Sequence, residues 1–186
     1  LAKQVEDFIG KSKYKKEVTL VHESKLLGTA GTLMKNIDFY KNEDGLLIHA
    51  DNYCFSKLNK LVTAHKNRPS NCVITMMTFR TETPSTCGIV ELDKRGVVTG
   101  FYEKVKSPPS NLANGAIYVL SRDLLKRLKE EFSNLSDFSL EVLPKLIGKI
   151  YTYETKNFFI DIGTVKSYKK ANLLHSNPKN LKNSYL

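Results

Sequence analysis

Two aspartates in this sequence stand directly after short apolar segments, where a carboxylate can act as a metal ligand. Asp51 ends the stretch LIHAD, and Asp161 ends the stretch FFID. Two carboxylates in one crevice are the minimal protein ligand set for Mg²⁺, which keeps several waters and takes its remaining ligands from substrate phosphates. Aspartate also suits turns and helix caps, so either residue alone has an ordinary structural explanation. The pair predicts a magnesium site if the fold brings both side chains to one crevice.

A turn of small residues, LLGTAGT at residues 26–32, precedes a helical pattern. Gly28 and Gly31 allow a ligand to approach the backbone closely, and the first N–H groups of a helix have no partner within it. Such a turn can present these N–H groups to a base or a phosphate. Taken alone, it is a weak signal of binding.

A hairpin expected over residues 87–104 ends on two adjacent charged residues, Glu103 and Lys104. Neighbouring side chains of a strand face opposite ways, so both can reach one ligand only if the strand ends at this point. The following loop carries Asn111 and Asn114 into the next strand. A solvated charge pair and two turn asparagines are the structural alternative, which the sequence leaves open.

The net charge of +10 raises the question of nucleic-acid binding. No acidic residue follows Asp161, whereas several lysines do, and no basic stretch is interleaved with aromatic residues that could stack on bases. A basic surface, or a pocket for phosphorylated small molecules, explains the charge equally well. We expect no nucleic acid among the partners and keep a basic nucleic-acid-binding domain as a remote alternative.

The cysteines and histidines form no metal-binding or disulfide pattern in the sequence. The three cysteines lie 18 and 15 residues apart without a C-x-x-C pair, which favours inert packing residues in a reducing cytoplasm. His49 lies in an apolar stretch and is expected to be a core residue with its hydrogen bonds satisfied. No apolar run reaches the roughly 18 to 20 residues that cross a bilayer. We therefore expect no membrane contact and a cytoplasmic location.

Apolar runs and helical patterns alternate along the chain, and these elements must position the candidate residues. Strands are expected at residues 17–23, 45–51, 71–79, 115–121, 149–154 and 158–163, besides the hairpin at 87–104. Helices are expected at 31–37, 55–67, 122–132, 138–149 and 165–175, with Ser121 as an N-cap. The run at 45–51 predicts a strand buried on both faces, as in parallel sheets. This alternation predicts a three-layer α/β domain with a mixed, mostly parallel sheet, whose ligands sit beyond the carboxyl ends of its strands.

Six stretches together carry a resemblance to a known family. In chain order they are LLGTAGTL, LIHADNYCF, GIVELDKRGVVTGFYEKV, SNLANGAIYVLS, FSLEVLPKL and FFIDIGTVKSYKKAN. Their order and spacing resemble the sugar-1-phosphate nucleotidyltransferase family, nearest to its short guanylyltransferases for mannose 1-phosphate or D-glycero-D-manno-heptose 1-phosphate. The resemblance spans residues 1–174 and implies a Rossmann-like, GT-A-like nucleotidyltransferase domain. Residues 175–186 are expected to form a polar C-terminal tail.

The resemblance implies roles for the residues of the predicted crevice. Asp51 and Asp161 would hold Mg²⁺, and Lys104 would act with them in catalysis by neutralising the sugar phosphate. Glu103 and Asn114 would hydrogen-bond the hydroxyl groups of the sugar.

The activity that the resemblance implies is transfer of a nucleotidyl group from a nucleoside triphosphate, with GTP favoured, to a sugar 1-phosphate. Gly28, Thr29 and Ala30 would lie against the nucleobase side of the nucleotide. The products would be pyrophosphate and a nucleotide sugar for surface polysaccharide or glycoconjugate synthesis. A single in-line displacement requires no nucleophilic side chain, so the lack of a nucleophile motif is consistent with it. The expected partners are these two substrates, and a homo-oligomer is compatible with them.

The sequence departs from the family pattern in three places. Ala50 stands where the family usually has glycine, and Val105 stands where it often has proline. The family's opening strand and Gly-rich phosphate loop, with its arginine, have no counterpart in these residues. We therefore expect either an N-terminally truncated domain that is inactive by itself or a paralogue kept for binding or regulation.

Overall fold

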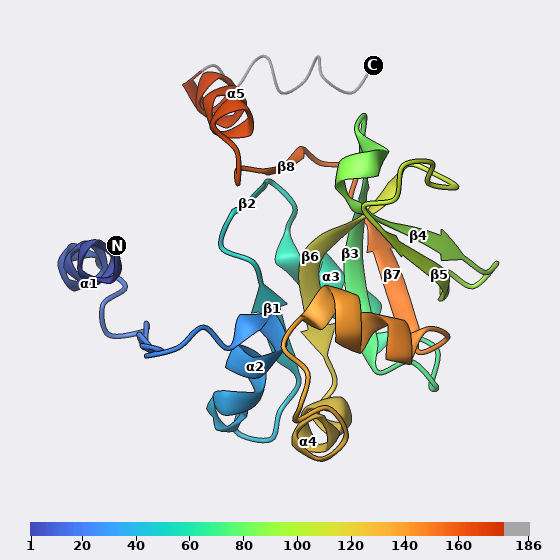
Figure 1. Ribbon diagram of the computed structural model, residues 1–186, viewed down its shortest axis with the longest axis horizontal. Helices are drawn as coiled ribbons and strands as arrows, with labels where there is room; N and C mark the ends of the chain where they lie inside the picture. Colours follow the sequence, from blue (N-terminus) through green and yellow to red (C-terminus); the bar gives the residue numbers. More distant parts are fainter. Residues whose placement is uncertain (177–186) are drawn as a thin grey trace.

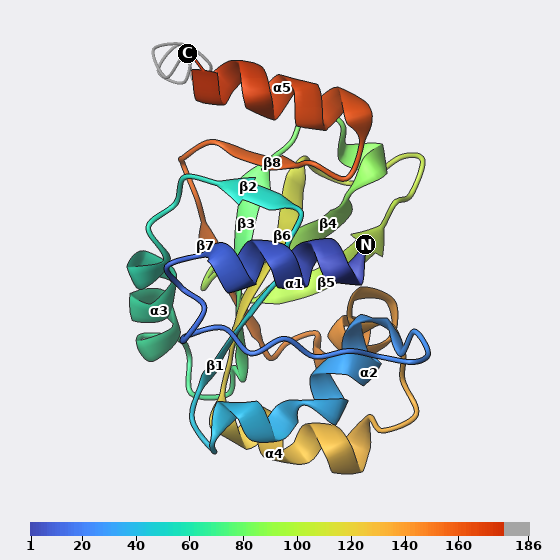
Figure 2. The ribbon, with the colours of Figure 1, turned by 90° about the vertical axis from the view of Figure 1, so that its left-hand side faces the viewer.

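The computed structural model describes residues 1–176 (Figures 1 and 2). Its strands are β1 (Gly45–Ile48), β2 (Asn52–Cys54), β3 (Ile74–Arg80), β4 (Gly88–Leu92), β5 (Val98–Glu103), β6 (Leu112–Leu120), β7 (Ile150–Glu154) and β8 (Phe159–Asp161). Six of them form one sheet in the order β5–β4–β6–β3–β7, in which β1 also pairs with β6. The remaining two, β2 and β8, form a separate ribbon.

The helices are distributed along the whole described chain. The α-helices are α1 (Ala2–Lys11), α2 (Gly28–Lys35), α3 (Leu58–Lys66), α4 (Arg122–Glu131) and α5 (Val165–Ser176). The short helical turns are η1 (Ile37–Tyr40), η2 (Pro84–Thr86), η3 (Phe138–Val142) and η4 (Leu143–Leu146). No helix within residues 1–176 is both long and apolar enough to cross a membrane.

Helices cover both faces of the main sheet. On one face α2, α4, η3 and η4 pack over the larger core, in which Ile74, Tyr118 and Phe138 have no exposed surface. On the opposite face Leu61 of α3 packs with Met77 and other residues of the sheet. In Figure 1 the orange turns η3 and η4 lie in front of the strands. This arrangement confirms a three-layer α/β domain with a mixed sheet.

The expectation that the sheet is mostly parallel is wrong. Among the strand pairs in residues 1–176, only β3 and β7 run parallel, whereas β6 runs antiparallel to β1, β3 and β4. A continuous apolar run indicates that both faces of a strand are covered, but its direction follows from the chain connections, which the run does not encode. For β1 even the burial was wrong, because Leu46 and Ile48 are 39% and 41% exposed.

The N-terminal quarter of the chain differs most from the prediction. Residues 17–23, expected to form a strand, are a turn followed by an irregular segment. A strand needs a partner edge for its hydrogen bonds, and none pairs with these residues in the described part of the chain. α1 was not predicted; it has no buried residue and stands apart from the sheet in Figure 1. α2 begins at Gly28, earlier than the predicted start.

The hairpin and the helix that follows β6 match the prediction. The turn between β4 and β5 is built on Asp93, whose carboxylate accepts the N–H groups of Arg95 and Val97. At the start of α4, Ser121 Oγ accepts the N–H of Leu124 at 3.2 Å, which confirms the predicted N-cap.

The two C-terminal helical segments match in part. The helix expected at 138–149 is shorter and divides into η3 and η4, where Pro144 has no N–H to continue it. α5 runs to Ser176, two residues into the expected tail. The rest of that tail, residues 177–186, lies outside the described residues.

The ribbon of β2 and β8 lies beyond one end of the sheet (Figure 2). Its register places Asn52 opposite Asp161. The ribbon is fastened to the sheet because the side-chain amide of Asn52 donates to the carbonyl of Gly115 at 3.0 Å. In addition, Phe159 stacks on Phe79, with the ring centroids 4.3 Å apart. The ribbon therefore holds the two predicted metal ligands next to the sheet.

Candidate functional site

The structure brings Asp51 and Asp161 together. The carbonyl of Asp51 accepts the N–H of Ile162 at 2.8 Å, so the backbone next to Asp161 is tied to Asp51. A Cβ added to Gly163 would lie 2.8 Å from Asp161 Oδ1 and 3.6 Å from Asp51 Oδ2. Both carboxylates therefore face the space that the missing side chain of Gly163 leaves open.

This pair suits a hydrated cation better than a fully protein-ligated one. Within residues 1–176 no group of three His, Cys, Asp or Glu side chains could enclose a metal. Two carboxylates with open space between them match Mg²⁺, which retains waters and takes further ligands from phosphates. One oxygen, Asp161 Oδ1, also accepts the N–H of Gly163 at 2.6 Å, which fixes that carboxylate. The residues present thus fit a magnesium ion.

A cavity of about 250 Å³ opens beside this pair. Five of the predicted site residues line it: Thr29, Glu103, Lys104, Asn114 and Asp161. They come from α2, the end of β5, β6 and β8, which are widely separated in the sequence. The fold therefore gathers the predicted charged and polar side chains in one place.

Glu103 and Lys104 both reach the cavity because the strand ends between them. β5 stops at Glu103, and Lys104 follows with φ 51°, in the left-handed region. Its side chain therefore escapes the alternation of the strand, and Lys104 Nζ lies 3.7 Å from Glu103 Oε1. On the neighbouring strand Gly88 makes room for Glu103, since a Cβ there would collide with Glu103 Oε2.

Asn114 is held firmly before any ligand binds. Its Nδ2 donates to the hydroxyl of Tyr118 at 2.7 Å, and its Oδ1 accepts the N–H of Ala116 at 2.9 Å. Burial raises the pKa of Tyr118, although hydrogen bonds with Asn114 and Ser139 oppose that shift, so the phenol stays neutral. One N–H of the Asn114 amide is left for a ligand. The other predicted loop asparagine, Asn111, does not line the cavity and instead accepts a hydrogen bond from Arg80.

The turn at the start of α2 is used mainly for packing. Ala30 is 1% exposed, and its N–H donates to the carbonyl of Ser136 at 2.9 Å. The expectation of free N–H groups at this helix start is therefore wrong for Ala30, whose side chain is also buried. The placement of Gly28, Thr29 and Ala30 against the nucleobase side of a nucleotide stays a prediction. Gly28 has φ 73° and also lies against Ser136. Of the three predicted residues only Thr29 lines the cavity, and its Oγ1 accepts the N–H of Phe138 at 2.8 Å.

Sequence reasoning missed several residues that line the same cavity. Asn52 directly follows Asp51 and His49 lies two residues before it, and Phe79 and Phe159 form an aromatic part of the wall. His49 was expected to have its hydrogen bonds satisfied, but its Nε2 has no partner among the described residues. Cys87, expected to be a packing residue, also lines the cavity. Only the position of Asn52, next to Asp51, could have marked it in the sequence.

Comparisons with known proteins found a matching family model and several curated relatives. Residues 2–177 match the family model described as "Nucleotidyl transferase". The chain is 32% identical over 165 residues to the glucose-1-phosphate adenylyltransferase of Mycoplasma mobile, covering 83% of this chain and 43% of that protein. It is 30% identical over 177 residues to a Sulfolobus acidocaldarius protein provisionally named mannose-1-phosphate guanyltransferase, covering 93% of this chain and 47% of that protein. The chain spans less than half the length of these curated relatives.

Solved structures show the same fold at lower identity. A Bacillus anthracis protein provisionally named glucose-1-phosphate thymidylyltransferase superposes with a TM-score of 0.78 at 20% identity, covering 92% of this chain and 72% of that one. HddC from Yersinia pseudotuberculosis superposes with a TM-score of 0.75 at 22% identity, covering 91% of this chain and 72% of that one. The predicted Rossmann-like fold class is thereby confirmed.

Proposed function

The chain belongs to the nucleotidyl transferase family, and on that basis we propose that it serves a transfer of a nucleotidyl group from a nucleoside triphosphate to a sugar 1-phosphate. The observation that carries the proposal is the position of Asp51 and Asp161 together, beside a cavity that Asp161, Glu103 and Lys104 line. Paired carboxylates next to a lysine suit a reaction between two phosphorylated substrates.

In the proposed reaction an oxygen of the sugar 1-phosphate attacks the α-phosphorus of the triphosphate. The bond from that phosphorus to the oxygen bridging it to the β-phosphate breaks, and pyrophosphate leaves with the electron pair. The side chains need only align the reactants and neutralise charge. Lys104 donates charge-assisted hydrogen bonds to the sugar phosphate, whereas Glu103 accepts from sugar hydroxyls and Asn114 donates to one.

Asp51 and Asp161 are the residues that would hold Mg²⁺. Charge neutralisation at the phosphate oxygens is the chemistry that such an ion supplies when bound. The two residues themselves contribute orientation, because the ribbon of β2 and β8 fixes both backbones and Asp161 Oδ1 is held by the N–H of Gly163.

For the nucleotide we favour GTP, and for the sugar a hexose or heptose 1-phosphate. The motif order supports this choice, as does the name of the Sulfolobus acidocaldarius relative. The adenylyltransferase names of other relatives make ATP the competing nucleotide. A cytoplasmic location and a use in glycoconjugate synthesis belong to the same proposal.

We also propose that the 186-residue chain by itself does not complete the reaction. The N–H of Ala30 is already paired, and no arginine lines the cavity within the described residues. The groups that would align a triphosphate are therefore few, and alignment alone contributes about 7 to 11 kcal/mol to such reactions. Binding of the sugar phosphate without turnover is also what a regulatory paralogue would show.

Calorimetric titration of the chain with sugar 1-phosphates tests the assignment. We expect saturable binding of mannose 1-phosphate or glucose 1-phosphate, weaker binding of the free sugars, and a further loss in Glu103→Gln. Glu91→Gln is the matched control, because Glu91 lies on the same hairpin and is bonded by Tyr102 instead of lining the cavity. If no sugar phosphate binds, or if Glu103→Gln binds as well as the parent chain, the assignment is wrong.

A pyrophosphate-release assay with each of the four ribonucleoside triphosphates separately tests whether the chain catalyses the reaction. The Mycoplasma mobile adenylyltransferase serves as the active reference. We expect no release above background from the 186-residue chain. Turnover at the reference rate would refute the proposal of an inactive chain. The triphosphate that gives this turnover would then identify the base.

A further inference from the structure

A second cavity, of about 270 Å³, lies where β3 and β7 end. These strands form the parallel pair of the sheet, so their last residues, Arg80 and Glu154, lie at the same edge. Ligands of α/β sheets commonly sit beyond the carboxyl ends of parallel strands. Lys156, just after β7, also lines this cavity, and Phe79 and Phe159 provide an apolar wall.

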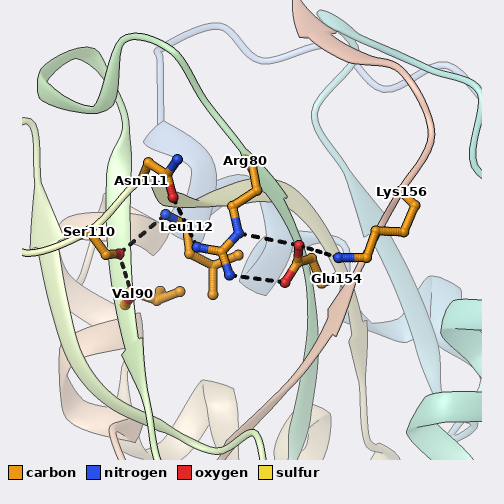
Figure 3. A network of polar contacts seen from close by, with 7 residues as sticks. All are labelled: Arg80, Val90, Ser110, Asn111, Leu112, Glu154 and Lys156. Carbon is orange, nitrogen blue, oxygen red and sulfur yellow. Dashed lines mark hydrogen bonds and ion pairs between the residues drawn. The ribbon is translucent and has the colours of Figure 1, made fainter. Parts of the chain in front are cut away.

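Its charged side chains form one network (Figure 3). Arg80 donates from Nε and Nη2 to the two oxygens of Glu154, each at 3.3 Å, and from Nη1 to Asn111 Oδ1 at 2.9 Å. Lys156 Nζ donates to Glu154 Oε1 at 2.8 Å. Burial alone would raise the pKa of Glu154, but the hydrogen bonds from Lys156 and Arg80 hold it below its ordinary value. The carboxylate is thus ionised and both of its oxygens are engaged.

The network keeps a positive charge and unused donors. Two cations, Arg80 and Lys156, meet one carboxylate. A guanidinium has five N–H donors and an ammonium three, so these hydrogen bonds leave two N–H groups on each residue without a partner among the described residues. Glu154 and Asn111 also hold the planar guanidinium in one orientation, which lowers the entropy cost of binding a further acceptor.

We propose that this cavity binds a small phosphomonoester, with its phosphate on Arg80 and Lys156 and its carbon skeleton against Phe79 and Phe159. A phosphate offers several oxygens to convergent donors and carries the charge that the network lacks. The cavity is at the small end of the range for ligand sites, which suits a ligand of sugar or aryl size. The charged residues of this site differ from those of the proposed function, because Asp161, Glu103 and Lys104 do not line it, although Phe79 and Phe159 form a wall that both cavities share.

Calorimetry of the whole chain at low ionic strength, with phenyl phosphate as the probe, tests this site. Inorganic phosphate and phenol are titrated separately. We expect phenyl phosphate to bind with higher affinity than inorganic phosphate or phenol, because each of these two occupies only part of the site. Arg80→Gln and Lys156→Gln should each weaken it about tenfold or more, the effect of one charge-assisted hydrogen bond. Lys156 is 81% exposed, so its replacement does not threaten the fold.

Two control variants locate the probe. Arg95→Gln removes another exposed arginine that is paired with an aspartate, at the turn of the hairpin. Lys104→Gln removes the lysine of the first cavity. Binding that survives both controls and weakens in Arg80→Gln and Lys156→Gln supports the site. Absence of saturable binding overturns the proposal, as does binding that is lost in Lys104→Gln and kept in Arg80→Gln. Phe79 and Phe159 remain unchanged because they line both cavities.

Discussion

Asn52 lies directly opposite Asp161 in the ribbon of β2 and β8. Because Asp51 immediately precedes Asn52, this register places the two carboxylates side by side, although most of the domain separates them in the sequence. The carbonyl of Asp51 reinforces the register by accepting the N–H of Ile162 at 2.8 Å. The magnesium hypothesis required that the fold bring both aspartate side chains to one crevice. The pairing of two short strands meets this condition.

Replacement of Gly163 by alanine should weaken metal binding without unfolding the chain. The new Cβ would lie 2.8 Å from Asp161 Oδ1 and 3.6 Å from Asp51 Oδ2, so at least one carboxylate must move. We expect an affinity for Mn²⁺ about tenfold to a hundredfold lower, as for other changes that misorient a metal ligand. The measurement is Mn²⁺-induced broadening of the amide signals of residues 51–53 and 160–164. Gly10→Ala is the control, because a Cβ there meets nothing within 4 Å. Equal broadening in both variants would contradict the site.

Replacement of Lys104 by glutamine should weaken sugar-phosphate binding by about tenfold to a hundredfold. The change removes a charge-assisted hydrogen bond of roughly 1.5 to 3 kcal/mol. The backbone cost at φ 51° stays similar, since neither residue is glycine. Calorimetry with mannose 1-phosphate measures the change. Lys106→Gln, at an exposed lysine outside the cavity, should bind like the parent chain. If both variants keep full affinity, Lys104 is only a surface charge.

Stability should fall in mild acid because of His65. This side chain is 1% exposed, with its Nδ1 2.8 Å from Thr75 Oγ1. Burial, assisted by Arg68 and opposed by Asp44, lowers its pKa to about 4 from 6.5. The folded state thus favours the neutral imidazole. The resulting stability is complete above pH 6.5 and is lost as the pH falls from there towards 4, by about 2 to 3 kcal/mol.

Urea unfolding at pH 7.5 and pH 4.5 measures this loss against His65→Gln. Carboxylates titrate in both proteins, so the informative quantity is the difference between their two pH dependences. We expect the parent chain to lose about 2 kcal/mol more than the variant over this interval. Parallel pH dependences would show that His65 does not couple folding to protonation.

Gly28→Ala should destabilise the fold more than Gly148→Ala. Both glycines have left-handed backbones, with φ 73° and 82°, so each alanine incurs the conformational cost of about 1 to 2 kcal/mol. At Gly148 a Cβ meets nothing within 4 Å, whereas at Gly28 it would collide with the carbonyl of Ser136. Thermal unfolding should therefore show a clearly larger drop in Tm for Gly28→Ala. Equal drops would mean that the contact with Ser136 relaxes without cost.

The charged residues of the candidate site could be located from the sequence because each stands at the end of a strand or within a few residues beyond it. The strand ends predicted at Asp161 and Glu103 are present in the structure. The strand predicted to end at Asp51 stops earlier, at Ile48, and Asp51 lies in the turn that leads into β2. The alternation of side-chain direction along a strand also implied that Glu103 and Lys104 could reach one ligand only if the strand ended between them, as it does. Candidate functional residues near strand ends can therefore be predicted from a single sequence.

Features that depend on distant partners were not predictable in this way. The N–H of Ala30 is occupied by Ser136, a residue far along the chain, and no local pattern reports that contact. The direction of β6 relative to β3 is likewise a property of the connections. The apolar character of Leu46 predicted that another segment would cover it. Its exposure depends on which segments lie over β1, and the residues of β1 do not encode that.

The ribbon of β2 and β8 is also expected to open more readily than the main sheet. A pair of strands this short is marginal in water by itself, and its hold on the sheet depends on a few contacts, such as Asn52 with Gly115 and Phe159 with Phe79. Its amide hydrogens should therefore exchange with solvent through local opening, at a lower free energy than those of β3 and β6. Each such opening separates Asp51 from Asp161 while the core stays folded. The pairing of the two carboxylates is consequently reversible. A bound ion or phosphate would lengthen the lifetime of the pair, so the exchange rate of the ribbon's amide hydrogens would report whether the site is occupied.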